Sequence, residues 1–526
     1  MRSERYRIGS LFIACVMIFS GCVKVGPDFI RPEPQVMQQW MEADEAQVRT
    51  SPADYRMWWT AFKDPVLDNL VQIAYAQNIP LRVAGARVFE ARARLGIAIG
   101  EQYPQFQQAL GSAFDIRESE RAPTAPQRRS PADQFEYKQA QVAAAAGWEI
   151  DFWGKFRRAV ESEDASFLGS IAAYDNALVS LTAEVARTYV AIRTIEERLR
   201  IAQENVDIQK ESLRIVQARF EAGSGTGLDV QQAIAQLRGT EAVVPQFEAS
   251  LQQAKNALCI LLGMPPGNLD HLLGDRLAIP QAPLEVAVGI PADLLRRRPD
   301  IRSAELQAAA QSALIGVAKA DLYPAFALNG SFGFLASDVG RFGLGDIAAW
   351  SSRYGSFGPS FAWNILNYGQ ITNNVRLQDA RFQELVFSYQ NTVLRAQQEV
   401  EDALTGFLQS QKSLIRLAEA AEAAKQSADL ASIQYQSGAT NFTTVISAQQ
   451  FLLSDQDSLA VAQGAVPQGL IAVYRALGGG WEQREGKPFL PADITTAMGQ
   501  RTDWGGLLEP AAVQPLDTRQ LLTPDW

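Results

Sequence analysis

The chain contains two copies of one large unit, and this duplication constrains its fold more than any other feature. From Trp148 onward, residue n aligns with residue n+215 without a gap for more than a hundred positions, whereas the offset upstream is 220. The matched pairs include Trp148 with Trp363, Gly154 with Gly369, Gly223 with Gly438, and Tyr103-Pro104 with Tyr323-Pro324. A period of this length excludes a solenoid, whose units span roughly 20–50 residues. We therefore expect a pseudo-symmetric scaffold rather than a protein built around a single catalytic cleft.

Composition excludes several classes of function. The 526 residues include one His and three Cys, which leaves little material for His/Cys metal sites or for His-based catalysis. The formal net charge is −10, whereas nucleic-acid binding calls for clusters of basic residues. Carboxylates are plentiful, but none accompanies a plausible nucleophile or metal-ligand set. We expect neither an enzyme nor a metal protein.

The first 21 residues have the composition of a signal peptide. Three arginines precede an apolar run from Ile8 to Phe19, which is too short for a membrane span of about 20 residues. Small residues then precede Cys22, as in the cleavage site of bacterial lipoproteins, and Val23 replaces the Asp that commonly retains lipoproteins in the inner membrane. We expect lipid on Cys22 and export to the outer membrane. The alternative is an ordinary secretory signal with an incidental cysteine. Cys259 has no partner for a disulfide after cleavage.

Two very long helices are expected, one in each copy. Residues 154–221 carry an apolar stripe at alternating spacings of three and four, interrupted only by Gln209, and residues 369–436 repeat it. A stripe of this length indicates helices that supercoil on one another. At 1.5 Å per residue, each helix would be roughly 100 Å long. Both end at Gly-containing turns, after which return helices run to Leu262-Gly263 and Leu477-Gly478.

Four shorter segments alternate between apolar and polar residues with a period of two: 105–117, 139–151, 326–334 and 357–365. Such segments are typical either of sandwich strands or of outer-membrane strands with one face toward lipid. The lipoprotein signal and the lack of another core favour the membrane. Four strands cannot close a barrel, and open sheet edges are not tolerated in lipid. The chain would therefore contribute its strands to a barrel shared between several copies.

Several ordered motifs carry a resemblance to a known family. They are Val25–Phe29 after Cys22, Trp58-Trp59 before Phe62–Pro65, Trp148–Gly154, Ile290–Ile301 and Tyr474–Trp481. With these motifs the chain resembles the outer membrane factors of tripartite efflux pumps, the TolC-like channels, and in particular their NodT-type lipoproteins.

The resemblance implies a mixed membrane α+β fold. Three protomers with four strands each would form a transmembrane β-barrel, and the long helices would continue it as a periplasmic α-helical barrel. The protein would be a passive conduit for small molecules, with a periplasmic adaptor and an inner-membrane transporter as partners. It would need no cofactor beyond the covalent lipid on Cys22.

On this interpretation the chain divides into six segments. These are a signal peptide (1–21), a lipidated N-terminal equatorial segment (22–63), a first repeat (64–263), an equatorial linker (264–298), a second repeat (299–478) and a C-terminal equatorial tail (479–526).

The helix turns 221–226 and 436–441 would lie at the periplasmic mouth. Small residues there would let a helical hairpin of an adaptor approach the backbone; they are Ala222, Gly223, Ser224, Ser437, Gly438 and Ala439. The simpler interpretation is that the glycines only end the helices, and both can hold.

Channels of this family narrow at the mouth through inward-facing side chains, often rings of Asp. Here the matching positions are Thr444 and Ser447, so the acidic ring is missing from the second copy. Asp229, the repeat partner of Thr444, and Tyr435 remain as gate candidates. The Tyr435 hydroxyl is expected either to hydrogen-bond across neighbouring helices or simply to end a packing stripe.

Two other classes of function stay open. An exit duct for type I protein secretion has the same fold and differs only in its partners. A lipid-anchored periplasmic coiled-coil scaffold would make the four alternating segments soluble strands.

Four aromatic residues lie at the expected junctions between strands and helices: Trp148, Trp153, Trp363 and Tyr368. We expect them either as membrane-interface anchors or as core residues.

Overall fold

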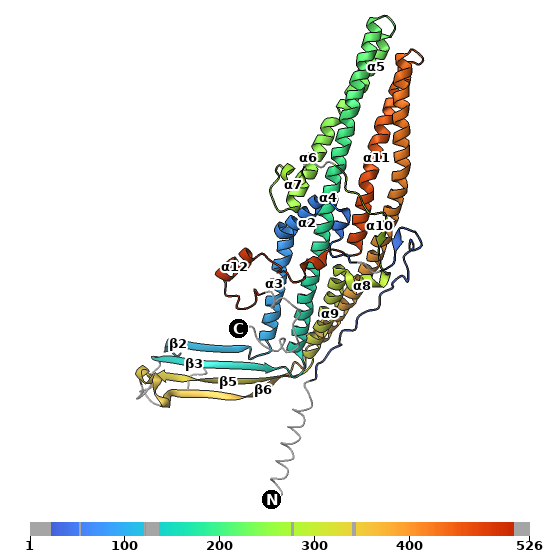
Figure 1. Cartoon of the computed structure of the whole chain (residues 1–526). Helices are drawn as coiled ribbons and strands as arrows, with labels where there is room; N and C mark the ends of the chain where they lie inside the picture. Colours follow the sequence, from blue (N-terminus) through green and yellow to red (C-terminus); the bar gives the residue numbers. More distant parts are fainter. Residues whose placement is uncertain are drawn as a thin grey trace.

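The computed structural model describes residues 23–51, 54–119, 121, 136–274, 278–338 and 343–509. The signal peptide and the lipidation candidate Cys22 lie outside these ranges. A β-sheet lies at one end of the molecule, and two long helical hairpins project from it to the opposite end (Figure 1). The hairpins are built on α4 (Lys155–Glu221) and α10 (Gln370–Gln436), which have 67 residues each. The prediction of two very long helices is confirmed.

The duplication holds element by element. Helix α3 (Ile79–Gly100) recurs after 220 residues as α9 (Pro299–Ala320), and α4 recurs after 215 residues as α10. The return helices differ, because α5 (Gly227–Glu241) and α6 (Val244–Leu261) are separated by a break, whereas α11 (Phe442–Ala476) is continuous. Pro245 lies in the first turn of α6, where its missing N–H is tolerated. Proline is rarely accommodated inside a helix, yet α11 contains Pro467 without ending there.

The main sheet has four antiparallel strands in the order β2-β3-β5-β6. They are β2 (Phe106–Arg117), β3 (Glu136–Ile150), β5 (Ala325–Ser337) and β6 (Arg353–Ala362). The four predicted strands are confirmed, but Trp363 and Ile365 follow the end of the fourth. Two short 3-10 helices, η3 (Leu344–Ala348) and η4 (Trp350–Ser352), join β5 to β6. Within the described ranges, no helix is both long enough and apolar enough to cross a membrane.

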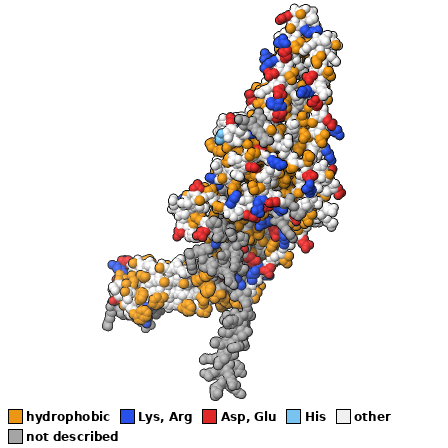
Figure 2. Space-filling view, viewed as in Figure 1, with side chains coloured by type: hydrophobic (Ala, Val, Ile, Leu, Met, Phe, Trp, Pro, Cys, Tyr) orange, Lys and Arg blue, Asp and Glu red, His pale blue; other side chains and the backbone are white. Residues whose placement is uncertain are grey.

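The apolar residues of β3, β5 and β6 share one face of this sheet. Trp148 lies opposite Leu328 across β3 and β5, and Phe326 lies opposite Phe361 across β5 and β6. Figure 2 shows hydrophobic side chains over much of the sheet, with charged side chains gathered at its free end.

Strand β2 is displaced by one residue from this symmetric arrangement. In the second copy Phe326 lies opposite Phe361, and the matching residues of the first copy, 220 and 215 positions earlier, are Phe106 and Ala146. The structure instead places Phe106 opposite Gly147. A shift of one residue turns every side chain to the other face of a sheet. The apolar residues of β2 therefore lie on the face opposite to those of the other three strands, which alternation within single strands could not reveal.

A girdle of short elements surrounds the middle of the helices. It contains the parallel pair β1 (Val48–Arg49) and β4 (Val286–Ala287). Its other members are η1 (Trp58–Phe62), α2 (Pro65–Gln77), α7 (Asp270–Leu273), η2 (Pro291–Asp293), α8 (Leu294–Arg297), η5 (Trp481–Arg484) and α12 (Ala492–Arg501). The main hydrophobic core lies here, where the girdle packs on α3, α4, α10 and α11.

Candidate channel mouth and N-terminal attachment

The two helix turns have the same backbone geometry. Gly223 and Gly438 adopt φ angles of 74° and 79°. The Ser224 N–H donates to the Arg219 carbonyl over 2.9 Å, and the Ala439 N–H donates to the Gln434 carbonyl over 2.8 Å. A left-handed glycine with these bonds ends a helix and satisfies its last carbonyls. The six predicted tip residues are all exposed, at the ends of the hairpins far from the sheet (Figure 1). Ending the helices is thus one role of the glycines.

Two of the four gate candidates bond to the residues that cap the return helices, Thr226 before α5 and Asn441 before α11. Asp229 and Thr226 form a reciprocal capping box at the start of α5, with both side chain–backbone distances at 3.2 Å. Thr444 donates its N–H to the side chain of Asn441 over 3.1 Å at the start of α11. Both repeat partners therefore donate their N–H to the side chain of the N-cap residue, and the Asp229 carboxylate also accepts the N–H of its cap. Ser447, one turn after Thr444, is exposed.

Tyr435 is buried where the two hairpins meet, not free on a surface. Its ring lies 5.2 Å from that of Phe442, and the Arg219 guanidinium carbon lies 4.6 Å above it. Arg219 also donates a hydrogen bond to the Tyr435 carbonyl. Burial raises the pKa of Tyr435, the negative charge of Asp229 adds to this, and Arg219 opposes it. The structure thus brings Asp229 near Tyr435.

The Tyr435 hydroxyl makes no hydrogen bond to any residue that the structure describes in the protomer. The contact between the hairpins uses the ring and the backbone carbonyl instead. Arg219, which makes this contact, was not singled out by the sequence. The residue at the matching position of the second copy is Gln434, so aligning the two copies does not reveal a role for Arg219. The sequence feature that could have indicated it is its place in the last turn of α4, where a positive charge is favourable.

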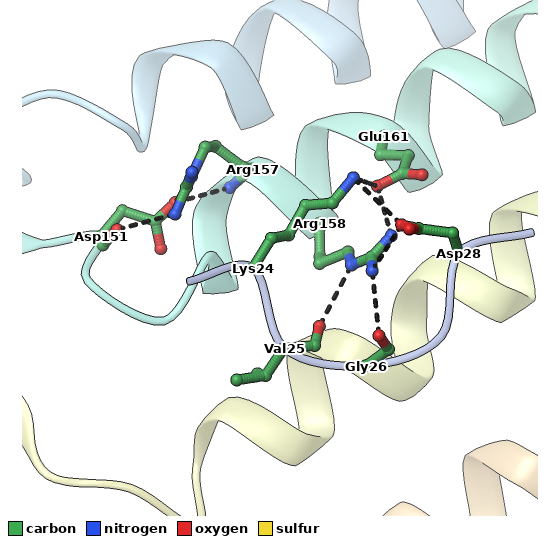
Figure 3. A network of polar contacts seen from close by, with 8 residues as sticks. All are labelled: Lys24, Val25, Gly26, Asp28, Asp151, Arg157, Arg158 and Glu161. Atoms are coloured by element: carbon green, nitrogen blue, oxygen red, sulfur yellow. Dashed lines mark hydrogen bonds and ion pairs between the residues drawn. The ribbon is translucent and has the colours of Figure 1, made fainter. Parts of the chain in front are cut away.

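The N-terminal segment is fixed where β3 passes into α4 (Figure 3). The Val25 N–H donates to the Trp153 carbonyl over 3.0 Å. The Arg158 guanidinium, which is only 1% exposed, donates to the carbonyls of Val25 (3.2 Å) and Gly26 (3.1 Å). Gly26 has a φ of 94°, and a Cβ there would lie 2.4 Å from the Gly316 Cα. Only glycine fits this close approach of the segment to α9.

Charged side chains complete this attachment. Arg158 pairs with Asp28 over 2.9 Å and with Glu161 over 2.8 Å, and Lys24 pairs with Glu161 over 3.1 Å. The hydrogen bond from Arg158 is the main cause that lowers the pKa of Asp28. Lys24 is two residues after Cys22, so the described segment begins beside the strand–helix junction. The sequence motif around Gly26 was recognised, but Arg158 was not.

The remaining motifs meet in the girdle. Trp58 stacks on Tyr474 with the ring centres 5.3 Å apart. Arg298 pairs with Asp300 over 2.6 Å and with Glu399 over 2.8 Å, and it donates to the Ala476 carbonyl over 2.7 Å. These contacts join the N-terminal segment, the linker and the end of the second repeat.

The junction tryptophans are also repeated. The indole N–H groups of Trp148 and Trp363 donate to the carbonyls of Gln102 and Leu322, both over 3.1 Å. Trp153 instead stacks on Tyr323 with the ring centres 4.6 Å apart, whereas Tyr368 is 97% exposed. Among the described residues, no group of three or more His, Cys, Asp or Glu side chains is placed to hold a metal ion.

Comparison with known proteins agrees with this architecture. The chain is 32% identical to the pyoverdine export outer membrane protein OpmQ of Pseudomonas aeruginosa, over 88% of this chain and 96% of that protein. It is 28% identical to nodulation protein T of Rhizobium leguminosarum bv. trifolii, over 85% and 92% of the two chains. It is also 28% identical to the toluene efflux pump outer membrane protein TtgC of Pseudomonas putida, over 92% and 97%.

Solved structures show the same fold. The outer-membrane channel OprN superposes with a TM-score of 0.80 at 33% identity, over 87% of this chain and all of that chain. The fold is that of one protomer of a trimeric outer-membrane channel, in which four strands enter a shared β-barrel that an α-helical barrel continues. The model of the outer membrane efflux protein family matches residues 70–264 and 290–479. The chain belongs to this family of outer membrane efflux proteins.

Proposed function

We propose that this outer-membrane channel is the exit duct of a tripartite efflux pump, anchored by lipid on Cys22 and coupled through a periplasmic adaptor to an inner-membrane transporter. One observation carries the proposal: two hairpins on helices of 67 residues project from a sheet of four strands. In the described part of the chain, no further strand pairs with the outer edges of β2 and β6. Such a sheet needs further copies to close in lipid. The transporter would supply the energy, and the duct would be passive.

The hairpin tips are the surface for the adaptor. Ala222, Gly223 and Ser224 at one tip and Ser437, Gly438 and Ala439 at the other are exposed and small. A Cβ at Gly223 would meet no atom within 4 Å, so a partner's helix can approach the backbone closely. Bulky substitutions at exposed Ser224 and Ser437 should abolish cross-linking to the adaptor without changing trimer assembly. Unchanged cross-linking would refute this role.

Small molecules are the proposed cargo. Two relatives are named for the export of pyoverdine and the efflux of toluene. The alignment with this chain covers more than nine-tenths of each of these two proteins. Type I protein secretion remains the second candidate, because the fold is shared and only the partners differ. Deleting the gene and measuring accumulation of small toxic compounds, alongside secretion of proteins into the medium, separates these two functions.

Lipid anchoring has its own test. The intact mass of the mature protein should show diacylglycerol and an acyl chain on Cys22, and Cys22→Ala should lack both.

The mass of the purified assembly in detergent tests whether the protein is a trimer. A trimer that conducts ions in planar bilayers supports the duct, whereas a monomer without conductance would leave a lipid-anchored scaffold.

The proposed gate lies at the hairpin tips, where Tyr435 holds α10 against Arg219. Tyr435→Ala removes the ring between Arg219 and Phe442 and should increase the open fraction of single channels. Tyr435→Phe is the matched control, since it keeps the ring and removes only a hydroxyl that has no described partner. Asp229→Ala, Thr444→Ala and Ser447→Ala test the other candidates. An open fraction that is the same in the Ala and Phe variants of Tyr435 would exclude the ring from the gate.

A further inference from the structure

Strand β2 carries its large apolar side chains on the face of the sheet that is opposite to the apolar face of the other three strands. Three of these side chains are about half exposed: 41% of Phe106, 44% of Leu110 and 57% of Phe114. Ile116 continues the row toward the free end of the sheet. We refer to these four residues as the β2 strip.

The face that carries the β2 strip is the one that suits the channel lumen. On the other face, large apolar residues lie opposite one another from β3 to β6: Val142 with Phe334, Trp148 with Leu328, and Phe326 with Phe361. In an outer-membrane barrel the apolar face of a strand meets lipid, and the other face lines the interior. The β2 strip is therefore an apolar surface inside the shared barrel.

The charged residues of the four strands lie almost entirely on the lipid-facing side. They gather near the free end of the sheet, where Figure 2 shows charged side chains, and they are Asp115, Arg117, Glu136, Lys138 and Arg353. On the lumen face of the described strands, Glu149 is the one charged residue, and it lies at the inner end beside the helices. From there to the free end of the strands, the lumen face is uncharged.

The rest of the lumen face, apart from Leu335, is small or polar. Contacts between polar side chains cross it: Asn329 donates to Ser360 over 2.7 Å, Gln141 donates to Tyr354, and the hydroxyls of Ser331 and Ser356 are 3.1 Å apart. The β3 residues beside the strip are Gly147, Ala145 and Ala143, which are too short to cover its side chains. The strip is thus an apolar row along a hydrated wall.

The strip is long enough to run through the whole barrel. Phe106 and Ile116 are ten residues apart, which is roughly 34 Å of extended strand. In a strand tilted by about 35–45°, this length covers about 25 Å of depth, which is the height of the apolar band of such barrels. Three protomers would place three strips around the lumen, so a molecule that leaves through the barrel passes a strip at every depth.

We infer that the β2 strip binds the apolar or aromatic part of small molecules that leave through the barrel. This inference rests on the proposed function as a duct for small molecules. The wall has no charged side chain between Glu149 and the free end of the strands, so the contact is apolar, and it is favourable because it removes apolar surface from water. A single row of side chains gives only weak binding. Weak binding at successive positions suits a conduit, since a molecule must be held well enough to enter and loosely enough to leave.

Cysteine reactivity tests the placement of the strip. Cys259 is buried, so the parent gives a low background. Leu110→Cys and Ser112→Cys, on the lumen face, should react with a charged, water-soluble methanethiosulfonate in the purified trimer. Ala109→Cys and Ala113→Cys are the matched controls on the same strand, and they should stay unreacted because apolar surroundings disfavour the thiolate. Reaction at positions 109 and 113 in place of 110 and 112 would give β2 the register of its repeat partner and would overturn the inference.

Protection by a soluble aromatic compound tests binding. Ser112→Cys places the thiol between Leu110 and Phe114 on the same face and leaves the strip intact. Benzenesulfonate and methanesulfonate carry the same charge, but only the first has a ring. A compound that binds with a Kd of about 10 mM should slow the reaction roughly threefold at about 20 mM. We expect this slowing with benzenesulfonate and none with methanesulfonate, and equal rates in the two compounds would overturn the inference.

Removal of the strip is the second arm of the same experiment. Adding Leu110→Ser and Phe114→Ser to Ser112→Cys should abolish the difference between the two sulfonates. Ser331→Ala is the matched control on the polar part of the lumen face and should keep the difference. Protection that survives loss of both apolar side chains would assign the binding to another surface and refute the inference. A parent protein that is not a conducting trimer would instead refute the proposed function, and the inference with it.

Discussion

Arg158 holds the N-terminal segment to the body of the protein, and its removal should release that segment. In Arg158→Ala, two carbonyls lose a charged donor, those of Val25 at 3.2 Å and Gly26 at 3.1 Å. The ion pairs count for less, because Asp28 and Glu161 are solvent-exposed to a large extent and Lys24 remains beside both. Hydrogen bonds to charged groups contribute about 1.5–3 kcal/mol each. We expect docking of the segment to weaken by about 3 kcal/mol in total.

Hydrogen exchange measures this loss directly. The Val25 N–H is bonded to the Trp153 carbonyl, so its exchange reports undocking of the segment. A loss of about 3 kcal/mol should speed exchange by roughly a hundredfold. Arg157→Ala is the matched control, since Arg157 bonds to Asp151 over 2.9 Å (Figure 3). Protection of Val25 that is equal in the two variants would refute the assignment of Arg158 as the anchor.

Three further substitutions test the tips and the girdle. Gly438→Ala places a side chain at a φ of 79° and should destabilise the protein by about 1 kcal/mol, measured as a lower unfolding midpoint in denaturant. Gly239→Ala is the control, because Gly239 has an ordinary φ and open space around it, and this variant should not lower the midpoint. Trp58→Ala removes a buried ring stacked on Tyr474 and should cost about 3–5 kcal/mol in the same assay, and a loss below 1 kcal/mol would contradict the packing. Burial raises the pKa of Glu482, so the folded protein binds this proton more tightly than the unfolded chain, and its contribution to stability falls as the pH rises through the folded pKa. Glu482→Gln should therefore raise the thermal midpoint of unfolding at neutral pH but not near pH 4. If the substitution shifts the midpoint equally at the two pH values, burial of the charged carboxylate is not the cause.

Much of the architecture could be predicted from the chain alone. The repeat offsets locate α4 and α10 to within one residue, because an apolar stripe with helical spacing is a local property that the second copy repeats. The turns at Gly223 and Gly438 and the four strands are predictable for the same reason. The sheet's four strands, taken with the rule that lipid tolerates no open edge, also predict assembly of several copies.

The sequence by itself therefore determined the elements, their duplication and the family. The tertiary structure decided which residues meet across long stretches of chain. Arg158 lies 133 residues from Val25, Arg219 lies 216 residues from Tyr435, and Arg198 lies 259 residues from Asp457. Such contacts depend on how helices pack against one another, which no local periodicity records. The register of β2 was decided in the same way, since alternation is satisfied by either of two pairings and only the packed sheet selects one.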